Sequence, residues 1–290
     1  MDTLTHQLAF LNHCRGIGRR TVWQMIQANP RLCDLHKCTR AELRSIFHLS
    51  EAQIQLFMED RSHIDLIRLL EAYQAEEISI IPFHHPNYPS LLKNIYDPPY
   101  LLYTKGNIAL LNDKKILSVV GTRYPSVEAG KVLRGLIGPL ISDGWTIISG
   151  MATGIDGMAH RLALHGRTIA VLGSGLWHPY PSQNRRLFQQ LCEEQLVISE
   201  YPPSAPPERW RFPERNRIIS GMALGTLVVE ARERSGSLIT ADQALEQGRE
   251  VFAVPGSILN VMSAGTNRLI QQGAKLVCDW QDIVQELNWA

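Results

Sequence analysis

The chain has 290 residues, of which 44% are hydrophobic and 20% charged, and its formal net charge is +1. This length and composition allow a sizeable buried core, and the charge balance excludes a polybasic tail or a surface that is positive all round. Any nucleic-acid site must therefore be a local basic patch.

The sequence carries no signal for export or for a zinc site. The first ten residues, MDTLTHQLAF, lack a basic segment followed by an apolar one, and no stretch reaches the roughly 18 apolar residues that cross a membrane. The five cysteines form no CxxC pair, which favours free thiols in a reducing compartment. We therefore expect a cytoplasmic protein without membrane contact or a bound metal.

Residues 1–74 are predicted to form a small all-α domain, because stretches such as TVWQMIQA have helical spacing and no β-rich run occurs. The stretch CRGIGRRTVWQMI sets Gly16 and Gly18 between two helical segments with basic residues beside them. It resembles a helix-hairpin-helix (SAM-like) turn that binds a DNA phosphate, but such a turn can equally just join two helices. A passage with five prolines, residues 81–107, is predicted to connect this domain to the next.

Residues 75–290 are predicted to form an extended Rossmann-like domain of the α/β class. Short β-branched runs at 116–120, 145–149, 168–173, 196–199, 226–231, 250–255 and 274–278 alternate with amphipathic segments. Such alternation is typical of a doubly wound, mostly parallel sheet with helices on both faces. In these folds, ligands bind outside the carboxyl ends of the strands.

Three predicted strand ends are rich in small residues: Gly121-Thr122-Arg123, residues 149–156, and Gly173-Ser174-Gly175. Small residues let the backbone approach an anion, and the following helix offers unpaired N–H groups. One such loop can serve the turn alone, whereas three in succession, with an arginine among them, favour phosphate binding. The first loop lacks G-x-G-x-x-G and no Walker motif occurs, so we expect no NAD, ATP or other cofactor.

The stretch ERWRFPERNRIISG, residues 208–221, interleaves four arginines with two aromatic residues. It precedes the strand at 226–231, so we expect it to enter a helix at the edge that carries the glycine loops. Its guanidinium groups would then face phosphates and its aromatic rings would offer stacking surfaces to bases, which suits a single strand. In the alternative interpretation, the aromatic residues are core and the arginines form a solvated face.

Two further hypotheses use the same loops. The run ALGTLVVEARERSG resembles the G-T-x-x-E run of Rossmann proteins that cleave nucleotide N-glycosidic bonds, with Glu230 and Asp156 as conceivable acid and base. Alternatively, Glu230 ends a strand and orders a nearby arginine. Because no second convergent set of catalytic groups occurs, we do not expect an enzyme. A sensor of small nucleotides is the third hypothesis.

Five motifs, SVVGTR, IISGMATGIDGMAH, FPERNRIISGMALGTLVVEA, SGSLITADQALEQGREVFAVPG and SAGTNRLIQQGAKLV, have the order and spacing found in the DNA-processing protein A family, also called DprA or Smf. The resemblance covers residues 77–280. It implies a cytoplasmic bacterial protein that binds single-stranded DNA without sequence preference, protects incoming strands and loads the RecA recombinase onto them during natural transformation.

The resemblance also implies a homodimer, a single-strand-binding protein as a further partner, and a RecA contact after Val251. Many relatives carry a C-terminal winged-helix module, which we do not expect here because the chain ends soon after the last predicted strand. The residues that would bind DNA, with two for base stacking at the end, are Gly121, Thr122, Arg123, Ser149, Gly150, Ala152, Gly154, Asp156, Arg215, Asn216, Arg217, Arg234, Ser235, Gly236, Ser237, Trp210 and Phe212.

Overall fold

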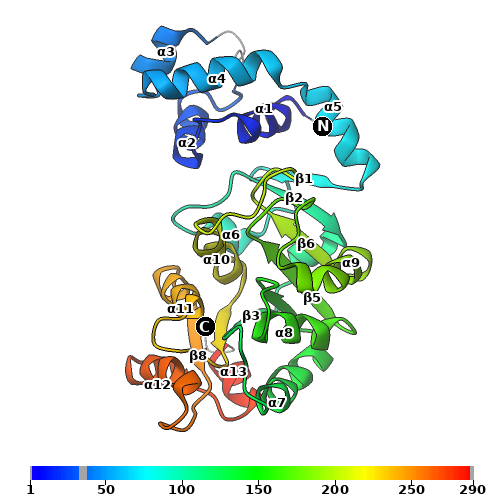
Figure 1. The fold of residues 1–290 in the computed structure, drawn as a ribbon, viewed down its shortest axis with the longest axis vertical. Helices are drawn as coiled ribbons and strands as arrows, with labels where there is room; N and C mark the ends of the chain where they lie inside the picture. The colour runs from blue at the N-terminus through cyan, green and yellow to red at the C-terminus, as the bar shows by residue number, and fades with distance from the viewer. Residues whose placement is uncertain (1, 33–37, 288–290) are drawn as a thin grey trace. The chain divides into compact units, whose positions relative to one another are not determined.

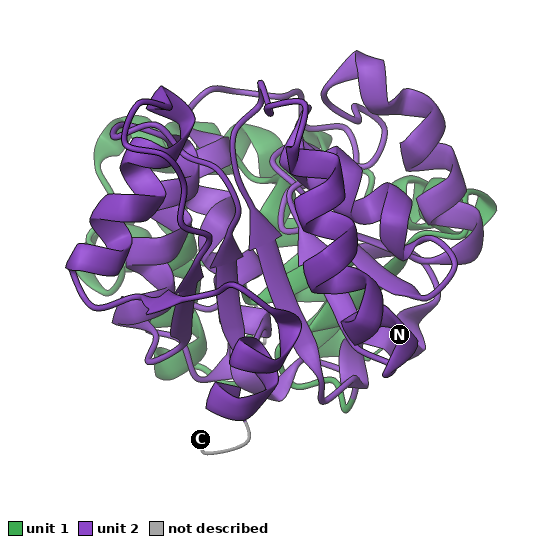
Figure 2. Ribbon diagram, turned by 90° about the horizontal axis from the view of Figure 1, so that it is seen from below, with its two compact units in different colours: residues 1–86, 99–103 green, residues 87–98, 104–290 purple. Residues whose placement is uncertain are grey.

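The computed structural model describes residues 2–32 and 38–287. The chain divides into two compact units, residues 1–86 with 99–103 and residues 87–98 with 104–290 (Figure 2). Among the described residues, no helix is both long and apolar enough to cross a membrane. Cys14, Cys38, Cys192 and Cys278 are free thiols, and Cys33 lies outside the described residues.

Unit 1 is mainly helical and ends in extended chain. Several of its helices begin at capping residues: the Asp2 side chain accepts a bond from the N–H of Thr5, and Ser50 forms a reciprocal capping box with Gln53. Its elements are α1 (Thr3–His13), α2 (Arg19–Ala28), α3 (Arg40–Ser45), α4 (Glu51–His63), α5 (Leu66–Ala75), β1 (Ser79–Pro82) and the first residues of β2 (Leu101–Gly106).

The turn between α1 and α2 packs against α4. Gly16 has a φ of +77° that favours glycine, and its carbonyl oxygen accepts a bond of 3.0 Å from the side chain of Gln53. The guanidinium group of Arg15 is bound by Asp60, with Nη2 to Oδ1 at 2.8 Å. The chain around Gly16 is therefore held within unit 1, and its binding of DNA stays a prediction.

Unit 2 alternates strands with helices, in the order drawn in Figure 1. Its elements are α6 (Ser90–Lys93), η2 (Ile108–Asn112), β3 (Ile116–Val120), α7 (Ala129–Ser142), β4 (Thr146–Ser149), α8 (Ile155–Ala163), β5 (Arg167–Leu172), η3 (Ser182–Asn184), α9 (Arg185–Glu194), β6 (Leu196–Ser199), α10 (Arg211–Met222), β7 (Gly225–Val228), α11 (Gly236–Glu246), β8 (Glu250–Ala253), η4 (Val261–Ser263), α12 (Ala264–Gln271), β9 (Lys275–Leu276) and α13 (Trp280–Leu287).

The strands of unit 2 pair in the order β6-β5-β4-β3-β7-β8-β9. All these pairs are parallel, with Leu117 opposite Ile147 and Val119 opposite Leu227. The chain leaves β3 toward β4, β5 and β6, and later returns to the other side of β3 as β7. The neighbouring carboxyl ends of β3 and β7 thus form the topological switch point at which such folds bind ligands.

Helices cover both faces of this sheet. Leu117 and Val119 of β3 belong to one buried cluster with the apolar sides of α7, α8 and α13. Successive side chains of a strand point to opposite faces, so Ser118 and Val120 face the other layer. There α10 packs on β3, and α11 packs on β7. This arrangement confirms the predicted α/β class and the doubly wound, mostly parallel sheet.

The proline-rich passage contains more regular structure than a plain connection. β1 begins before it, and the short α6 and the strand β2 lie within it. The prolines conceal these elements because each removes a backbone donor and interrupts the hydrophobic pattern. The strands predicted from Ile116 onward are present, several of them shorter than their β-branched runs.

Candidate nucleic-acid interface

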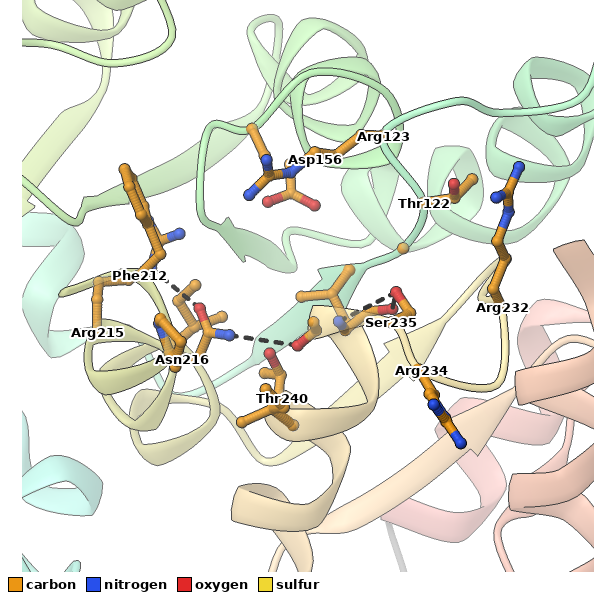
Figure 3. A pocket seen from close by; sticks show the side chains of 18 of the residues that line it. Thr122, Arg123, Asp156, Phe212, Arg215, Asn216, Arg232, Arg234, Ser235 and Thr240 are labelled. Carbon is orange, nitrogen blue, oxygen red and sulfur yellow. Dashed lines mark hydrogen bonds between the residues drawn. The ribbon is translucent and has the colours of Figure 1, made fainter. Parts of the chain in front are cut away.

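A pocket of about 650 Å³ lies at the switch point between β3 and β7. Its walls are the loops after these two strands and the first turns of α10 and α11 (Figure 3). Single residues from α8 and from the loops after β4, β5 and β6 complete the lining. The lining residues are Val120, Gly121, Thr122, Arg123, Tyr124, Ala152, Asp156, Tyr180, Arg209, Phe212, Pro213, Arg215, Asn216, Ile219, Arg232, Arg234, Ser235, Gly236, Ser237, Ile239 and Thr240.

Four exposed arginines surround the pocket: Arg123, Arg209, Arg232 and Arg234. Arg232 and Arg234 project from the loop after β7, and Arg123 comes from the loop after β3 (Figure 3). Within 2–32 and 38–287, none of the four forms an ion pair with a carboxylate. Their guanidinium donors therefore face solvent, where an anion can reach them.

The only acidic residue among the lining side chains is Asp156, and it is buried beside Arg215. Burial raises the pKa of the Asp156 carboxyl, while Arg215 opposes this shift. Burial also lowers the pKa of the Arg215 guanidinium to about 10, and Asp156 opposes that shift in turn. The charges of this pair offset each other, so the exposed arginines set the potential of the pocket.

Arg215 uses much of its hydrogen-bonding capacity inside the protein. Its Nη1 donates to the carbonyl oxygen of Gly150 at 2.8 Å and to that of Val171, and its Nε donates to the Asn216 side chain at 3.1 Å. These bonds connect α10 to the ends of β4 and β5. Arg215 thus lines the pocket as a fixed part of its wall.

The loop after β4 packs beneath the loop after β3. Gly154 has a φ of +78°, and a Cβ there would meet the carbonyl oxygen of Thr122, so only glycine fits. The N–H of Ile155 donates to that same oxygen at 3.1 Å. A Cβ on Gly150 would lie 2.8 Å from Cζ of Arg215. Neither glycine is among the lining residues, and both permit close packing.

Ser149 and Thr122 also have partners within the protein. The Ser149 hydroxyl donates to the carbonyl oxygen of Val119 at 2.6 Å, and the residue is fully buried. The Thr122 hydroxyl accepts a bond from the N–H of Tyr124 at 3.2 Å. Of the predicted residues in the first two loops, Gly121, Thr122, Arg123, Ala152 and Asp156 line the pocket.

Arg217 lies outside the set of lining residues, in a buried ion pair. Its Nη2 contacts Oε1 of Glu200 at 2.6 Å, and its Nε lies 3.8 Å from Oδ2 of Asp97. Arg217 and Glu200 are both buried. The structure does not bring this arginine together with the other predicted phosphate-binding residues.

The two aromatic residues predicted to stack on bases are separated. Phe212 lines the pocket beside Tyr180, with ring centroids 5.3 Å apart. Trp210 is not among the lining residues, and its ring lies against the guanidinium group of Arg211, 5.1 Å from Cζ to the ring centroid. Tyr201 contacts the same guanidinium group at 4.9 Å.

The start of α11 forms the wall opposite Arg123. The Ser235 hydroxyl caps this helix by accepting a bond from the N–H of Ser237, and it lies 2.7 Å from the Ser237 hydroxyl. Asn216 donates to the carbonyl oxygen of Gly236 at 3.4 Å and so connects α10 to α11 (Figure 3). Arg234, Ser235, Gly236 and Ser237 all line the pocket, as does Asn216.

Glu230, the conceivable acid of the enzyme hypothesis, has a positioning role. Its carboxylate accepts bonds from the N–H of Ser126, at 2.9 Å, and from the Ser126 hydroxyl. Its carbonyl oxygen accepts a bond of 2.7 Å from the N–H of Thr122. Glu230 therefore fixes residues 122–126, and with them Arg123 and Tyr124, at the rim of the pocket.

Several lining residues were missed from the sequence. Arg234 was selected through the family resemblance; Arg232 and Thr240 lie close to it after β7, where ligands of such folds bind. Tyr124 directly follows Arg123, so the argument that selected the loop after β3 could have included it. Tyr180 had no sequence signal, because it lies near the end of the loop between β5 and η3, whose course only the structure reveals.

The described part of the chain contains no group of three or more His, Cys, Asp or Glu that could hold a metal ion. The side chains that line the pocket offer guanidinium groups, hydroxyl groups and aromatic rings. Such a set binds an anion with flat apolar groups attached, and the pocket offers it four exposed cationic side chains.

Comparisons with known proteins agree on one family. The model of the family described as DNA recombination-mediator protein A matches residues 79–288. DNA processing protein DprA of Bacillus subtilis is 47% identical over 224 residues, which cover 77% of this chain and 75% of that protein. DNA processing protein DprA of Streptococcus pneumoniae is 45% identical over 241 residues, covering 81% and 82%.

Two solved structures resemble this chain. An X-ray structure of DNA processing protein A from Streptococcus pneumoniae has a TM-score of 0.87 and 38% identity, and covers 99% of each chain. A structure of DNA processing protein A from Helicobacter pylori has a TM-score of 0.67 and 28% identity, and covers 73% of this chain and 95% of its own. The latter is described as giving insight into the single-stranded DNA binding mode of that protein.

Proposed function

This chain belongs to the DNA recombination-mediator protein A family, and from that premise we propose that it binds single-stranded DNA in the pocket at the switch point and loads RecA onto it. The family description is that of a recombination mediator and not of an enzyme. The observation that carries the DNA-binding part is the convergence of four exposed arginines on one pocket, none of which forms an ion pair with a carboxylate of the described residues.

The composition of the pocket favours a single strand over other anions. Exposed guanidinium groups bind backbone phosphates without reading sequence. Phe212 and Tyr180 offer ring faces that accept any unpaired base, and base stacking on an aromatic residue contributes roughly 1–3 kcal/mol. A duplex keeps its bases stacked on each other and cannot use these rings. Lack of sequence preference follows from phosphate contacts and stacking alone.

Fluorescence anisotropy of a labelled oligonucleotide over a salt series tests this proposal. We expect tight binding to the single strand, weaker binding to the duplex, and loss of about tenfold in affinity for Arg123→Ala. The log–log salt slope should fall by about 0.7 in that variant, the value for one phosphate contact on a single strand. Arg167→Ala, an exposed arginine at the opposite edge of the sheet, should bind like the wild type.

Two results would contradict the proposal. If a mononucleotide competed as well as the oligonucleotide, the pocket would serve a nucleotide sensor. If Arg123→Ala bound the strand like the wild type, the DNA would not bind in this pocket. Release of a base from a mononucleotide would support the enzyme hypothesis.

The RecA part of the proposal rests on the family. We infer that the bound strand is protected and passed to RecA in the bacterial cytoplasm, as strands that enter during natural transformation require. The test is RecA filament assembly on DNA coated with single-strand-binding protein. Assembly should accelerate with the wild type and not with Arg123→Ala, and an unchanged rate with the wild type would contradict the loading step.

The proposal includes a homodimer, supported by apolar side chains between β8 and η4. Ile258 and Leu259 are 93% and 90% exposed, and Val261 of η4 is also exposed. Adjacent exposed apolar residues of this kind mark protein interfaces. Sedimentation should show a dimer for the wild type and for Ile67→Glu, an exposed residue of α5, and a monomer for Leu259→Glu. A dimer in all three would remove this surface from the proposal.

A further inference from the structure

A second group of exposed arginines lies beside the pocket. Arg161 projects from α8, and Arg185 and Arg186 begin α9. None of the three forms an ion pair with a carboxylate of the described chain. We name this group the α8–α9 arginine patch. It is absent from the residues that line the pocket.

Asn184 joins the patch to the rim of the pocket. Its Nδ2 donates to the carbonyl oxygens of Met151 and Ala152, at 3.0 and 3.1 Å. Its Oδ1 accepts a bond of 3.3 Å from Nη1 of Arg161. Ala152 lines the pocket and Arg185 follows Asn184 in the chain. The contact between Ala152 and Asn184 and the contact between Asn184 and Arg161 therefore connect the pocket to the guanidinium group of Arg161.

Neither of the two helices that carry the patch has an exposed acidic residue close to these arginines. The acidic residues of α9 are Glu193 and Glu194, at its other end and roughly 12 Å from Arg185 along the helix axis. That distance exceeds the Debye length of about 8 Å at physiological salt. Asp156 of α8 is buried beside Arg215. The patch is thus a site of positive potential continuous with that of the pocket.

The side chains on and around the α8–α9 arginine patch indicate which kind of molecule binds there. Among residues 181–194, no large hydrophobic side chain is exposed, whereas protein interfaces have an apolar centre. A polyanion needs only the guanidinium groups. Because the pocket rim leads directly to these groups, the occupant is the same strand that fills the pocket.

We propose that single-stranded DNA leaves the pocket across Ala152 and Asn184 and binds the α8–α9 arginine patch through its backbone phosphates. The patch then adds sequence-independent contacts and lengthens the strand that the protein covers. This inference rests on the proposed function, because it assigns the path of the strand beyond the pocket.

The test measures anisotropy with two labelled oligo(dT) strands, a short one that fills only the pocket and a longer one. The variants are the triple Arg161→Gln, Arg185→Gln, Arg186→Gln, and the control triple Lys114→Gln, Lys115→Gln, Arg167→Gln, which removes equal charge at the amino ends of β3 and β5. For the long strand, the patch variant should lower the log–log salt slope by about 2, at about 0.7 for each of three phosphates. The short strand should be unaffected.

Three other outcomes of this test would each contradict the patch proposal, and each would do so for a different reason. If the patch variant binds both strands like the wild type while Arg123→Ala loses both, the patch proposal fails and the pocket stands. If the patch and control variants weaken the long strand equally, the effect is one of net charge and the patch proposal fails. If the wild type binds neither strand, the proposed function fails, and this inference with it.

Discussion

Both α10 and the loop after β7 carry arginines, but the structure places these side chains in different environments. Arg215 and Arg217 are buried, and their donors bind carbonyl oxygens of the sheet or the Glu200 carboxylate. Arg232 and Arg234 are exposed and have no carboxylate partner among the described residues. Charge alone therefore does not make a phosphate-binding residue, since the guanidinium group must also lie where a ligand can reach it.

Helix geometry explains why Arg215 and Arg217 separate. Residues two apart on an α-helix point roughly 200° from each other around its axis. Arg215 faces the pocket wall, so Arg217 must face the opposite side, where it finds Glu200 and Asp97. The RNR motif thus contributes one arginine to the pocket and one to the packing of α10.

The largest expected effect concerns stability. Arg217→Met removes the guanidinium group that forms a buried ion pair with the Glu200 carboxylate, so we expect the free energy of unfolding to fall by about 3–5 kcal/mol. Urea denaturation measures this change. Arg232→Met, which removes an exposed arginine, should alter stability by no more than about 0.5 kcal/mol.

A double variant separates loss of the ion pair from loss of packing. Adding Glu200→Gln to Arg217→Met also removes the buried negative charge that Arg217 balanced, so the double variant should be more stable than the single one. If Arg217→Met unfolded at the wild-type urea concentration but bound single-stranded DNA weakly, Arg217 would contact phosphate, and the distinction between buried and exposed arginines would fail.

The next effect concerns binding. Replacing both Arg232 and Arg234 by Ala removes two guanidinium groups that we propose contact phosphates, so we expect about tenfold weaker binding for each and about a hundredfold for the pair. Stability should not change, because both side chains are exposed. Glu233→Ala, between them, is the matched control, and its anisotropy titration should show wild-type or slightly tighter binding. Equal loss in Glu233→Ala would indicate disruption of the loop.

The sequence predicted the framework of unit 2 well. Buried parallel strands are continuous β-branched runs, and this pattern located the strands from β3 to β9 and hence the carboxyl edge where the pocket lies. β1 and β2 were missed because prolines flank them. The five motifs identified the family correctly.

The site was predicted less completely, because a motif does not reveal which donors are already used. Gly150 and Gly154 lie in a glycine-rich loop that resembles an anion-binding loop, but they serve packing against Arg215 and Thr122. Tyr180 reaches the pocket only through the course of the β5 loop. Such assignments need coordinates, since they depend on contacts between distant segments.

A pH-dependent effect on stability is expected from His160, a buried polar residue of α8. Burial lowers the pKa of its imidazole from 6.5 to about 3, and Nδ1 lies 2.7 Å from the Thr168 hydroxyl. Between these pH values the unfolded chain binds more protons than the folded one. The free energy of unfolding should therefore fall as the pH drops from 6.5 toward 3, by up to about 1.4 kcal/mol per pH unit, and should be insensitive to this group above 6.5.

Urea denaturation at a series of pH values checks this dependence. His160→Gln should show a shallower fall below pH 6.5 than the wild type, even if its stability is lower throughout. The exposed His178→Gln should keep the wild-type slope. Equal slopes in all three proteins would show that His160 does not resist protonation.

The smallest effect is expected at Trp210, which distinguishes a ring outside the pocket from one that lines it. Trp210 is 56% exposed and contacts the Arg211 guanidinium group, so Trp210→Ala should change affinity for single-stranded DNA by less than about twofold. Phe212→Ala removes a lining ring and should cost at least 1 kcal/mol of stacking, or about fivefold. Anisotropy titrations of both variants at one salt concentration compare them directly. A larger loss for Trp210→Ala would place the bases of the strand outside the pocket, on the exposed ring of Trp210.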